Sequence, residues 1–274
     1  MNNIQILCTS EVLEALKDAN FKIVDVRPTD AYNGWRLRGE KRGGHIAGAR
    51  SLDAKWTNYM EWIEIVKSKG LQIDDSIIIY GYDMAESERV AVCLRKYGYL
   101  SVSIYSEFLT EWVVNDDLPM ERLERYRNLV HPEWVKSVID NERIEEAPNA
   151  RVVIVHSHYR NRDAYLSGHI PTAIDMDTLA LEAPETWNRR SPEELKKALE
   201  EHGITADTTV VLYGKYMSPD NADEFPGSAA GDIAAMRNAF IMLYAGVKDV
   251  RILNGGFKAW EDAGYEVDYN DEPK

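Results

Sequence analysis

A glycine-rich segment, Gly227-Ser228-Ala229-Ala230-Gly231, stands directly before a helical pattern over residues 234–244. The first amides of a helix lack partners within the helix and carry a partial positive charge, so such a segment could wrap a small anion. Arg237, in the first turns of the pattern, could reach a bound group. Asp232 would favour the helix dipole but compete with an anion. The segment therefore predicts an anion-binding site.

Nucleophiles are scarce in this chain. The hydroxyl of Ser228 could attack a substrate only with a base beside it, and no base is identifiable by spacing, so we favour a helix cap. Cys93 stands in an apolar helical run, where a cysteine is usually a small buried hydrophobe. Cys8 lies at a strand or turn before a helix that Thr9 or Ser10 would cap. No catalytic residue is predicted.

Three histidines could gather near the same loop. His156 and His158, two residues apart on one strand, would face the same side, and His169 with Asp220 or Asp223 could join them. The spacing is too loose to predict a metal site. We expect His156 to be a half-buried, hydrogen-bonded residue, and we predict no metal and no other cofactor.

These residues lie within a unit that occurs twice. Ile23-Val24-Asp25-Val26-Arg27 followed by Gly44-His45-Ile46 matches Val153-Ile154-Val155-His156-Ser157 followed by Gly168-His169-Ile170. Further on, the β-branched runs 77–80 and 210–213 each precede a helical pattern that ends at a glycine, Gly98 or Gly246, and then another short strand. Alternating strands and helices favour a parallel sheet with helices on both faces, formed once by each copy.

The motifs resemble those of the rhodanese family over nearly the whole chain. Asp25-Val26-Arg27 with Gly44-His45-Ile46 is similar to its first signature, and Leu253-Asn254-Gly255-Gly256-Phe257-Lys258-Ala259-Trp260 to its C-terminal one. The layout resembles thiosulfate and 3-mercaptopyruvate sulfurtransferases. The resemblance implies an α/β fold of two tandem rhodanese-like domains, each a parallel five-stranded sheet flanked by helices. We place these domains at 1–128 and 129–274, with a charged linker over 119–127.

The same resemblance implies a persulfide chemistry that needs a cysteine. In the family a cysteine follows the buried strand, normally in the second domain, and a loop of inward-pointing amides stabilises its thiolate and persulfide. Here Gly214 occupies that position counted from the strand, and Ser228 or Ala229 occupies it counted from the helix. The first-domain loop, 81–88, also lacks a cysteine.

The second-domain loop, 214–237, is enlarged. Only 8 positions separate Gly81 from Arg89, whereas 23 separate Gly214 from Arg237, a difference of 15. The insertion either reshapes the site or is a tolerated surface loop. Arg189 and Arg190 resemble the family's basic residues before a Ser-Pro helix start, and they complete the anion-binding candidates. They could equally pair with Glu185 and Glu193.

Composition narrows the choice of partners and compartment. The net charge of −14 disfavours nucleic acid and membrane surfaces. No apolar stretch is long enough to span a membrane, the first residues show no secretory signal, and two cysteines are too few for a disulfide framework, so we expect a cytoplasmic protein.

Our preferred hypothesis is a sulfurtransferase-family protein that has lost the persulfide mechanism and binds a small anion, a sulfur-containing ligand or a protein partner. One alternative is an enzyme of altered chemistry that uses the enlarged loop and His156. Another is a working sulfurtransferase that uses Cys93 or Cys8.

Overall fold

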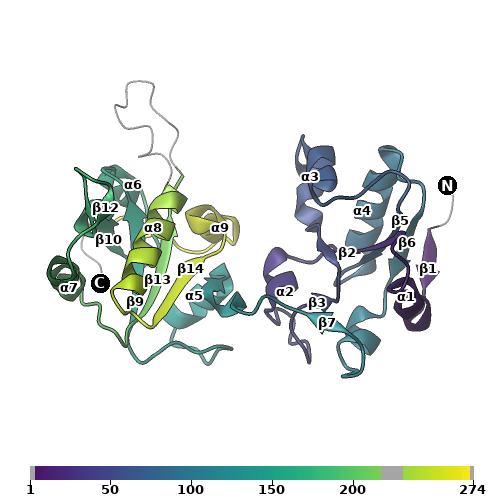
Figure 1. The fold of residues 1–274 in the computed structure, drawn as a ribbon, viewed down its shortest axis with the longest axis horizontal. Coiled ribbons are helices and arrows are strands. Elements are labelled where there is room, and N and C mark those ends of the chain that lie inside the picture. The colour runs from purple at the N-terminus through teal and green to yellow at the C-terminus, as the bar shows by residue number, and fades with distance from the viewer. Residues whose placement is uncertain (1–3, 217–230, 272–274) are drawn as a thin grey trace. The chain divides into compact units, whose positions relative to one another are not determined.

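The computed structural model describes residues 4–216 and 231–271, and the chain divides into two compact units, Met1–Tyr126 and Arg127–Lys274 (Figure 1). The first unit contains β1 (Gln5–Leu7), α1 (Thr9–Ala15), β2 (Phe21–Asp25), α2 (Thr29–Asn33), β3 (His45–Ile46), β4 (Arg50–Ser51), η1 (Ala54–Asn58), α3 (Trp62–Ser68), β5 (Ser76–Tyr80), α4 (Met84–Lys96), β6 (Val102–Tyr105), the π-helical turn η2 (Phe108–Trp112) and β7 (Met120–Glu121).

The second unit repeats the alternation of strands and helices. It contains η3 (Tyr126–Asn128, at the boundary), β8 (Leu129–Val130), α5 (Pro132–Ile139), β9 (Val152–His158), α6 (Arg162–Leu166), β10 (Ile174–Asp177), η4 (Thr178–Ala180), β11 (Glu182–Ala183), β12 (Asn188–Arg189), α7 (Pro192–Glu201), β13 (Thr209–Gly214), α8 (Gly231–Tyr244), β14 (Asp249–Leu253) and α9 (Gly256–Asp262).

Each unit has a five-stranded sheet at its centre. The strand orders are β1-β6-β5-β2-β4 and β10-β9-β13-β14-β8, and all of these neighbours pair in parallel. Helices lie on both faces of each sheet (Figure 1). The predicted architecture, two successive α/β domains that each contain a five-stranded parallel sheet flanked by helices, is confirmed.

The sheets are covered on both faces because their central strands are apolar on both sides. In β5, Ile77 and Ile79 face α3 and α4, whereas Ile78 and Tyr80 face α1 and the turn at Phe108–Trp112. In the second unit, Val210 and Leu212 of β13 pack under α7 and α8. Tyr213 points to the opposite face, where its ring stacks on Phe257 of α9. Continuous burial of this kind is typical of central parallel strands.

The helices end where the glycines predict and begin earlier than the apolar pattern suggests. Gly98 and Gly246 follow α4 and α8 with φ of 92° and 96°, as a helix C-terminus favours.

The segment expected as a linker, 119–127, belongs in part to the first unit, because its strand β7 pairs with β3 in antiparallel fashion. Among the described residues, no helix is both long and apolar enough to cross a membrane.

Candidate functional site

The two Gly-His-Ile motifs have the same structural role. In the first unit the ring of His45 stacks on Tyr32 at 3.7 Å, and the amide of Ile46 donates to the hydroxyl of Tyr80 over 3.0 Å. In the second, His169 stacks on Tyr165 at 3.8 Å, and Ile170 donates to Tyr213 over 2.9 Å. Each motif therefore fixes a turn beside the tyrosine that ends the central strand.

In the first unit, a buried ion pair fills the space next to that tyrosine. Arg27 Nη2 lies 2.6 Å from Asp25 Oδ2, and the hydroxyl of Tyr80 donates to the same carboxylate over 2.8 Å. Although burial of Arg27 disfavours its charge, the carboxylate of Asp25 raises the pKa of the guanidinium overall. All three side chains are fully buried, so the pair is a structural feature of the core.

The first-unit loop, 81–88, is closed by its own side chains. Tyr82 is nearly buried and donates a hydrogen bond to Glu40. Asp83 caps α4 by accepting from the amide of Glu86 over 2.9 Å, so a carboxylate already occupies the end of the helix that an anion would need. A Cβ added to Gly81 would lie 2.8 Å from Val26 Cγ2, which leaves no room for a side chain unless Val26 shifts.

In the second unit, histidines replace the ion pair. His156 and His158 occupy the strand positions of Asp25 and Arg27, and their rings lie 6.4 Å apart on one face of β9. His156 is fully buried, 4.9 Å from the ring of Tyr213 and 5.6 Å from that of Tyr165. Neither of its ring nitrogens has a hydrogen-bond partner among the described residues.

The expectation of a half-buried, hydrogen-bonded His156 is therefore wrong, because aromatic rings surround the imidazole where polar groups were expected. This burial, together with the nearby His158, lowers the pKa of His156 to about 3.

His158 is held by polar groups on both sides of its ring. Nδ1 accepts from the amide of Asn161 over 3.1 Å, and Nε2 lies 2.8 Å from Asp175 Oδ1. Arg162 Nε donates to the other oxygen of Asp175 over 3.1 Å. Although partial burial opposes the charge of Asp175, contacts with His158 and Arg162 lower the pKa of its carboxyl. This arrangement fixes the His158 ring with its Nε2 towards Asp175.

A second polar pair lies on the opposite face of the sheet, below α8. Asn238 of α8 donates from Nδ2 to Ser157 Oγ over 3.2 Å, and both residues are fully buried. The Asn238 Oδ1 atom has no hydrogen-bond partner among the described residues. Val26 and Val90 stand at the matching positions of the first unit. Below its helix, the second unit thus has two buried polar side chains where the first unit has two valines.

The end of β13 leaves no space for a side chain at the position where the family resemblance places a cysteine. A Cβ added to Gly214 would lie 2.0 Å from both the carbonyl carbon and the oxygen of Gly231, the first residue of α8. A Cβ added to Gly231 would lie 2.4 Å from the oxygen of Lys215. Backbone packs directly on backbone here, which only glycine permits.

The arginines predicted to bind an anion have other partners. Arg237 Nη2 lies 2.6 Å from Glu182 Oε1, and Arg190 donates from Nη2 to the carbonyl of Leu179 over 2.8 Å. Arg189 stacks over the ring of Tyr244 at 4.1 Å. Of the predicted anion-binding segment, Gly231 is described, whereas Gly227, Ser228, Ala229 and Ala230 lie outside the described residues. The anion site stays a prediction.

Neither cysteine lies in a loop that matches the family's site. Cys8 is exposed at the N-terminus of α1, where its own position is the cap in place of Thr9 or Ser10, and its amide donates to Glu11 over 2.8 Å. Cys93 is partly buried and packs against the core of the first unit. Asp220 and Asp223 lie outside the described residues, and within 4–216 and 231–271 no group of three His, Cys, Asp or Glu residues is placed to hold a metal ion.

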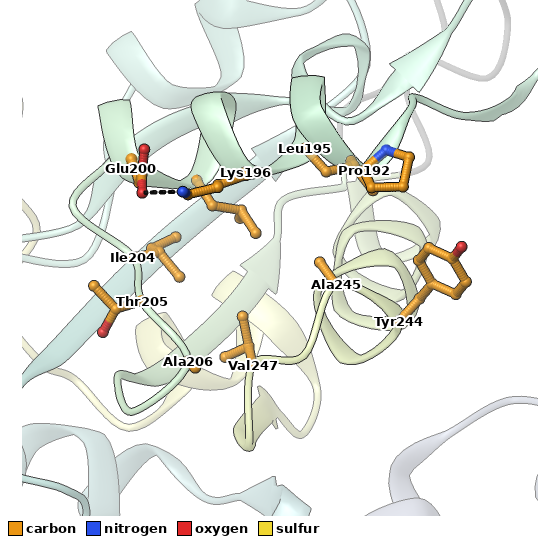
Figure 2. Close-up of a pocket in the computed structure, with 11 residues that line it drawn as sticks. Pro192, Leu195, Lys196, Glu200, Ile204, Thr205, Ala206, Tyr244, Ala245 and Val247 are labelled. Atoms are coloured by element: carbon orange, nitrogen blue, oxygen red, sulfur yellow. Dashed lines mark ion pairs between the residues drawn. The ribbon is translucent and has the colours of Figure 1, made fainter.

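A cavity of about 600 Å³ opens at the other end of the second sheet (Figure 2). It lies between α7 and the end of α8, with Leu195, Ile204 and Val247 among its walls and Tyr244 at one side. Lys196 and Glu200 form an ion pair of 3.8 Å along α7. Ile204, Thr205 and Ala206, which precede β13, also line the cavity. The cavity therefore lies at the opposite end of β13 from Gly214.

Sequence reasoning missed Asn238, Ser157 and Asp175. Asn238 could have been found by aligning the helices of the two copies and Ser157 by aligning their strands, because each is a polar residue where the first copy has valine. No sequence signal identifies Asp175, which meets His158 only through the pairing of β10 with β9.

Comparison with known families gives two matches along the chain. The rhodanese-like domain matches residues 9–115 and 158–263.

Thiosulfate sulfurtransferase YnjE of Escherichia coli strain K12 is 34% identical over 265 residues, which is 96% of this chain and 56% of that protein. The sulfur carrier protein TtuD of Thermus thermophilus is 33% identical over 159 residues, 53% of this chain and 48% of that protein.

Among solved structures, the anaerobic ergothioneine biosynthesis enzyme from Chlorobium limicola, in complex with its natural substrate trimethyl histidine, is 59% identical with a TM-score of 0.95. The match covers 99% of this chain and 64% of that chain. A structure of EanB with ergothioneine covalently linked to a cysteine persulfide is equally similar, at 59% and 0.95, over 99% of this chain and 64% of that one. The chain thus spans less than two thirds of these proteins.

Proposed function

Because the chain belongs to the rhodanese-like family, we propose that these 274 residues are the binding part of a sulfur-transfer protein, and that the persulfide is formed on a cysteine outside them. Within the chain, the second unit contributes the polar strand ends around His158 and Ser157. The first unit contributes a closed, structural copy of the same fold.

The contact between Gly214 and Gly231 carries this proposal. A persulfide needs a thiol at the end of the central strand with amides around it, and here that space is filled by the backbone of α8. The first-unit loop is filled by Tyr82 and capped by Asp83. The greater length of the relatives and the persulfide of EanB support a cysteine located in another domain.

A thiocyanate assay tests the proposal. The 274-residue chain, incubated with thiosulfate and cyanide, is expected to form thiocyanate at the rate of buffer alone. The matched control is the Cys8→Ser/Cys93→Ser variant, which should behave identically. Robust thiocyanate formation that disappears in Cys93→Ser or Cys8→Ser would refute the proposal, because it would place the reactive sulfur inside this chain.

The solved structures favour a substrate class as a second proposal. The 59% identity over 99% of the chain to an ergothioneine biosynthesis enzyme supports sulfur transfer to a trimethylated histidine. The test is a chimera in which this chain replaces the matching part of the Chlorobium limicola enzyme. With a sulfane-sulfur donor and trimethyl histidine, the chimera should form ergothioneine. A chimera that folds and forms a persulfide but leaves trimethyl histidine unconverted would contradict this substrate class.

A further inference from the structure

The outer face of α8 is apolar where solvent-facing helices are normally charged. We call the α8 face the set of exposed residues Ile233, Met236, Phe240, Leu243 and Tyr244. Phe240 is 72% exposed, Ile233 58% and Met236 50%. Their spacing puts them along one side of the helix over about 17 Å. The opposite side, with Ala235, Ala239 and Met242, is already buried in the core of the second unit. The helix is therefore apolar almost all round.

The first unit provides an internal comparison for this helix. The buried residues of α4, Ser87, Val90, Ala91 and Leu94, each lie 148 positions before those of α8, Ala235, Asn238, Ala239 and Met242. At the same offset, Glu88, Arg95 and Lys96 match Met236, Leu243 and Tyr244. Three of the five positions of the α8 face are thus charged in the first unit and apolar in the second, whereas Ile233 and Phe240 match the smaller apolar residues Ala85 and Val92. A covered surface explains this difference, whereas the fold alone does not.

The surface beside the α8 face is held in a fixed shape. Trp187, 52% exposed, adopts a left-handed backbone with φ of 54°, which is unusual for so large a residue. Arg237, between Ile233 and Phe240 on the helix, donates to the carbonyl of Trp187 over 3.4 Å and lies 2.6 Å from Glu182. Arg189 stacks on Tyr244. Strained, fixed aromatic residues of this kind are typical of binding surfaces.

The cavity between α7 and α8 continues this surface. Tyr244 belongs to the α8 face and also lines the cavity of about 600 Å³ (Figure 2). An apolar helix face that leads into a pocket can accept an apolar anchor from a protein partner.

We propose that the α8 face is the docking surface for a rhodanese-like domain that carries the persulfide cysteine. The proposal rests on the proposed function, in which the reactive cysteine lies outside these 274 residues. About a third of the similar Chlorobium limicola chain lies outside the match, and that length is close to one of the units described here. A domain of that size is large enough to cover a face that spans three turns of helix.

Radical footprinting tests the docking directly. Oxidation of Met236, Phe240 and Tyr244 is compared between the 274-residue chain alone and the chimera with the remainder of the Chlorobium limicola enzyme. Met60, 98% exposed in the first unit, reports the radical dose. We expect at least a fivefold drop in oxidation of the α8 face in the chimera. Equal oxidation in both proteins would overturn the proposal.

Substitutions taken from the first unit provide the matched variant. Met236→Glu/Leu243→Arg/Tyr244→Lys introduces the residues that α4 carries at the same positions, so the chain alone should keep its Tm within a few degrees. In the chimera this variant should lower sulfur transfer at least tenfold and restore oxidation of Phe240. The control, Tyr97→Lys/Leu100→Lys on the first unit, should change neither. If the triple variant does not fold, Phe240→Val, which introduces the residue of Val92, should still raise the oxidation of Met236.

The outcomes separate this proposal from the proposed function. A persulfide on the chimera's own cysteine with unchanged oxidation of the α8 face would refute the docking alone. Persulfide on the isolated 274-residue chain would refute the proposed function. Self-association of the isolated chain that the triple variant abolishes would assign the face to a second copy of this chain and overturn the docking proposal.

Discussion

Gly214 and Gly231 are in direct backbone contact, so that a Cβ on Gly214 would lie 2.0 Å from the carbonyl of Gly231. This contact joins the end of the central strand of the second sheet to the first residue of α8. In a rhodanese-like fold the same place is where a reactive thiol would stand. The packing of these two glycines therefore leaves no room for a side chain at the end of β13.

Substituting Gly214 by alanine should destabilise the protein more than the matching change in the first unit. At Gly214 the added methyl meets backbone atoms that cannot move independently, whereas at Gly81 it meets the side chain of Val26. We expect the free energy of unfolding, measured in urea, to fall by about 3 kcal/mol or more in Gly214→Ala and by about 1 kcal/mol in Gly81→Ala. Equal decreases in unfolding free energy for the two variants would contradict this, because they would show that α8 can shift to make room for the methyl group.

The hydrogen bond between Ser157 and Asn238 should show strong coupling. Ser157→Val or Asn238→Val alone leaves a buried polar group unpaired and should cost about 1–3 kcal/mol. The double variant introduces the valines that the first unit has at both positions and should cost much less than the sum. Additive losses in the double-mutant cycle would contradict the pairing.

Acid should destabilise the second unit through His156. Burial lowers the pKa of His156 to about 3 in the folded protein, below the ordinary value near 6.5 of an unfolded chain. The unfolded state therefore binds a proton first as the pH falls, so stability is complete above about pH 6.5 and decreases between there and pH 3.

The measurement is the unfolding free energy of the wild type and of His156→Phe at pH 7 and pH 4.5. Between these values the wild type should lose about 2–3 kcal/mol more than the variant. His131, whose pKa burial also lowers, to about 4, is present in both proteins and cancels. Identical pH profiles would mean that the folded state accommodates the His156 proton.

Breaking the buried ion pair of the first unit should be costly. Arg27→Met leaves the buried carboxylates of Asp25 and Glu40 without their shared cation, and we expect the unfolding free energy in urea to fall by about 3–5 kcal/mol. Asp25→Asn/Arg27→Met removes the charges of Asp25 and Arg27 but leaves the carboxylate of Glu40, so it should recover only part of that loss. A double variant less stable than Arg27→Met would contradict this explanation.

The parts of the fold that depend on local pattern could be predicted from the sequence. The duplicated unit, the parallel sheets and the glycines after α4 and α8 follow from buried β-branched runs and from the preference of glycine for positive φ. The start of α4 at Met84 could not be predicted from the apolar pattern, because four polar residues, 86–89, precede its apolar run and Asp83 supplies the cap through a side-chain hydrogen bond.

The features of the site that depend on tertiary contacts could not be predicted. Nothing in the sequence around His156 indicates that the rings of Tyr165 and Tyr213 surround it. Arg190 and Arg237 stand near glutamates in the sequence or the fold, yet Arg190 donates mainly to a backbone carbonyl and Arg237 contacts Glu182, which is remote along the chain. Spacing identifies pairs that are close along the chain, such as Arg190 with Glu194, but not a pair between distant segments such as Arg237 with Glu182.

The most direct test of the central claim is the mass of the intact chain after incubation with thiosulfate and removal of small molecules. We predict a single species with the mass of the unmodified 274-residue chain, since no cysteine stands at either strand end. A species heavier by one sulfur atom, with that atom on Cys8 or Cys93 after digestion and lost on addition of cyanide, would contradict the account.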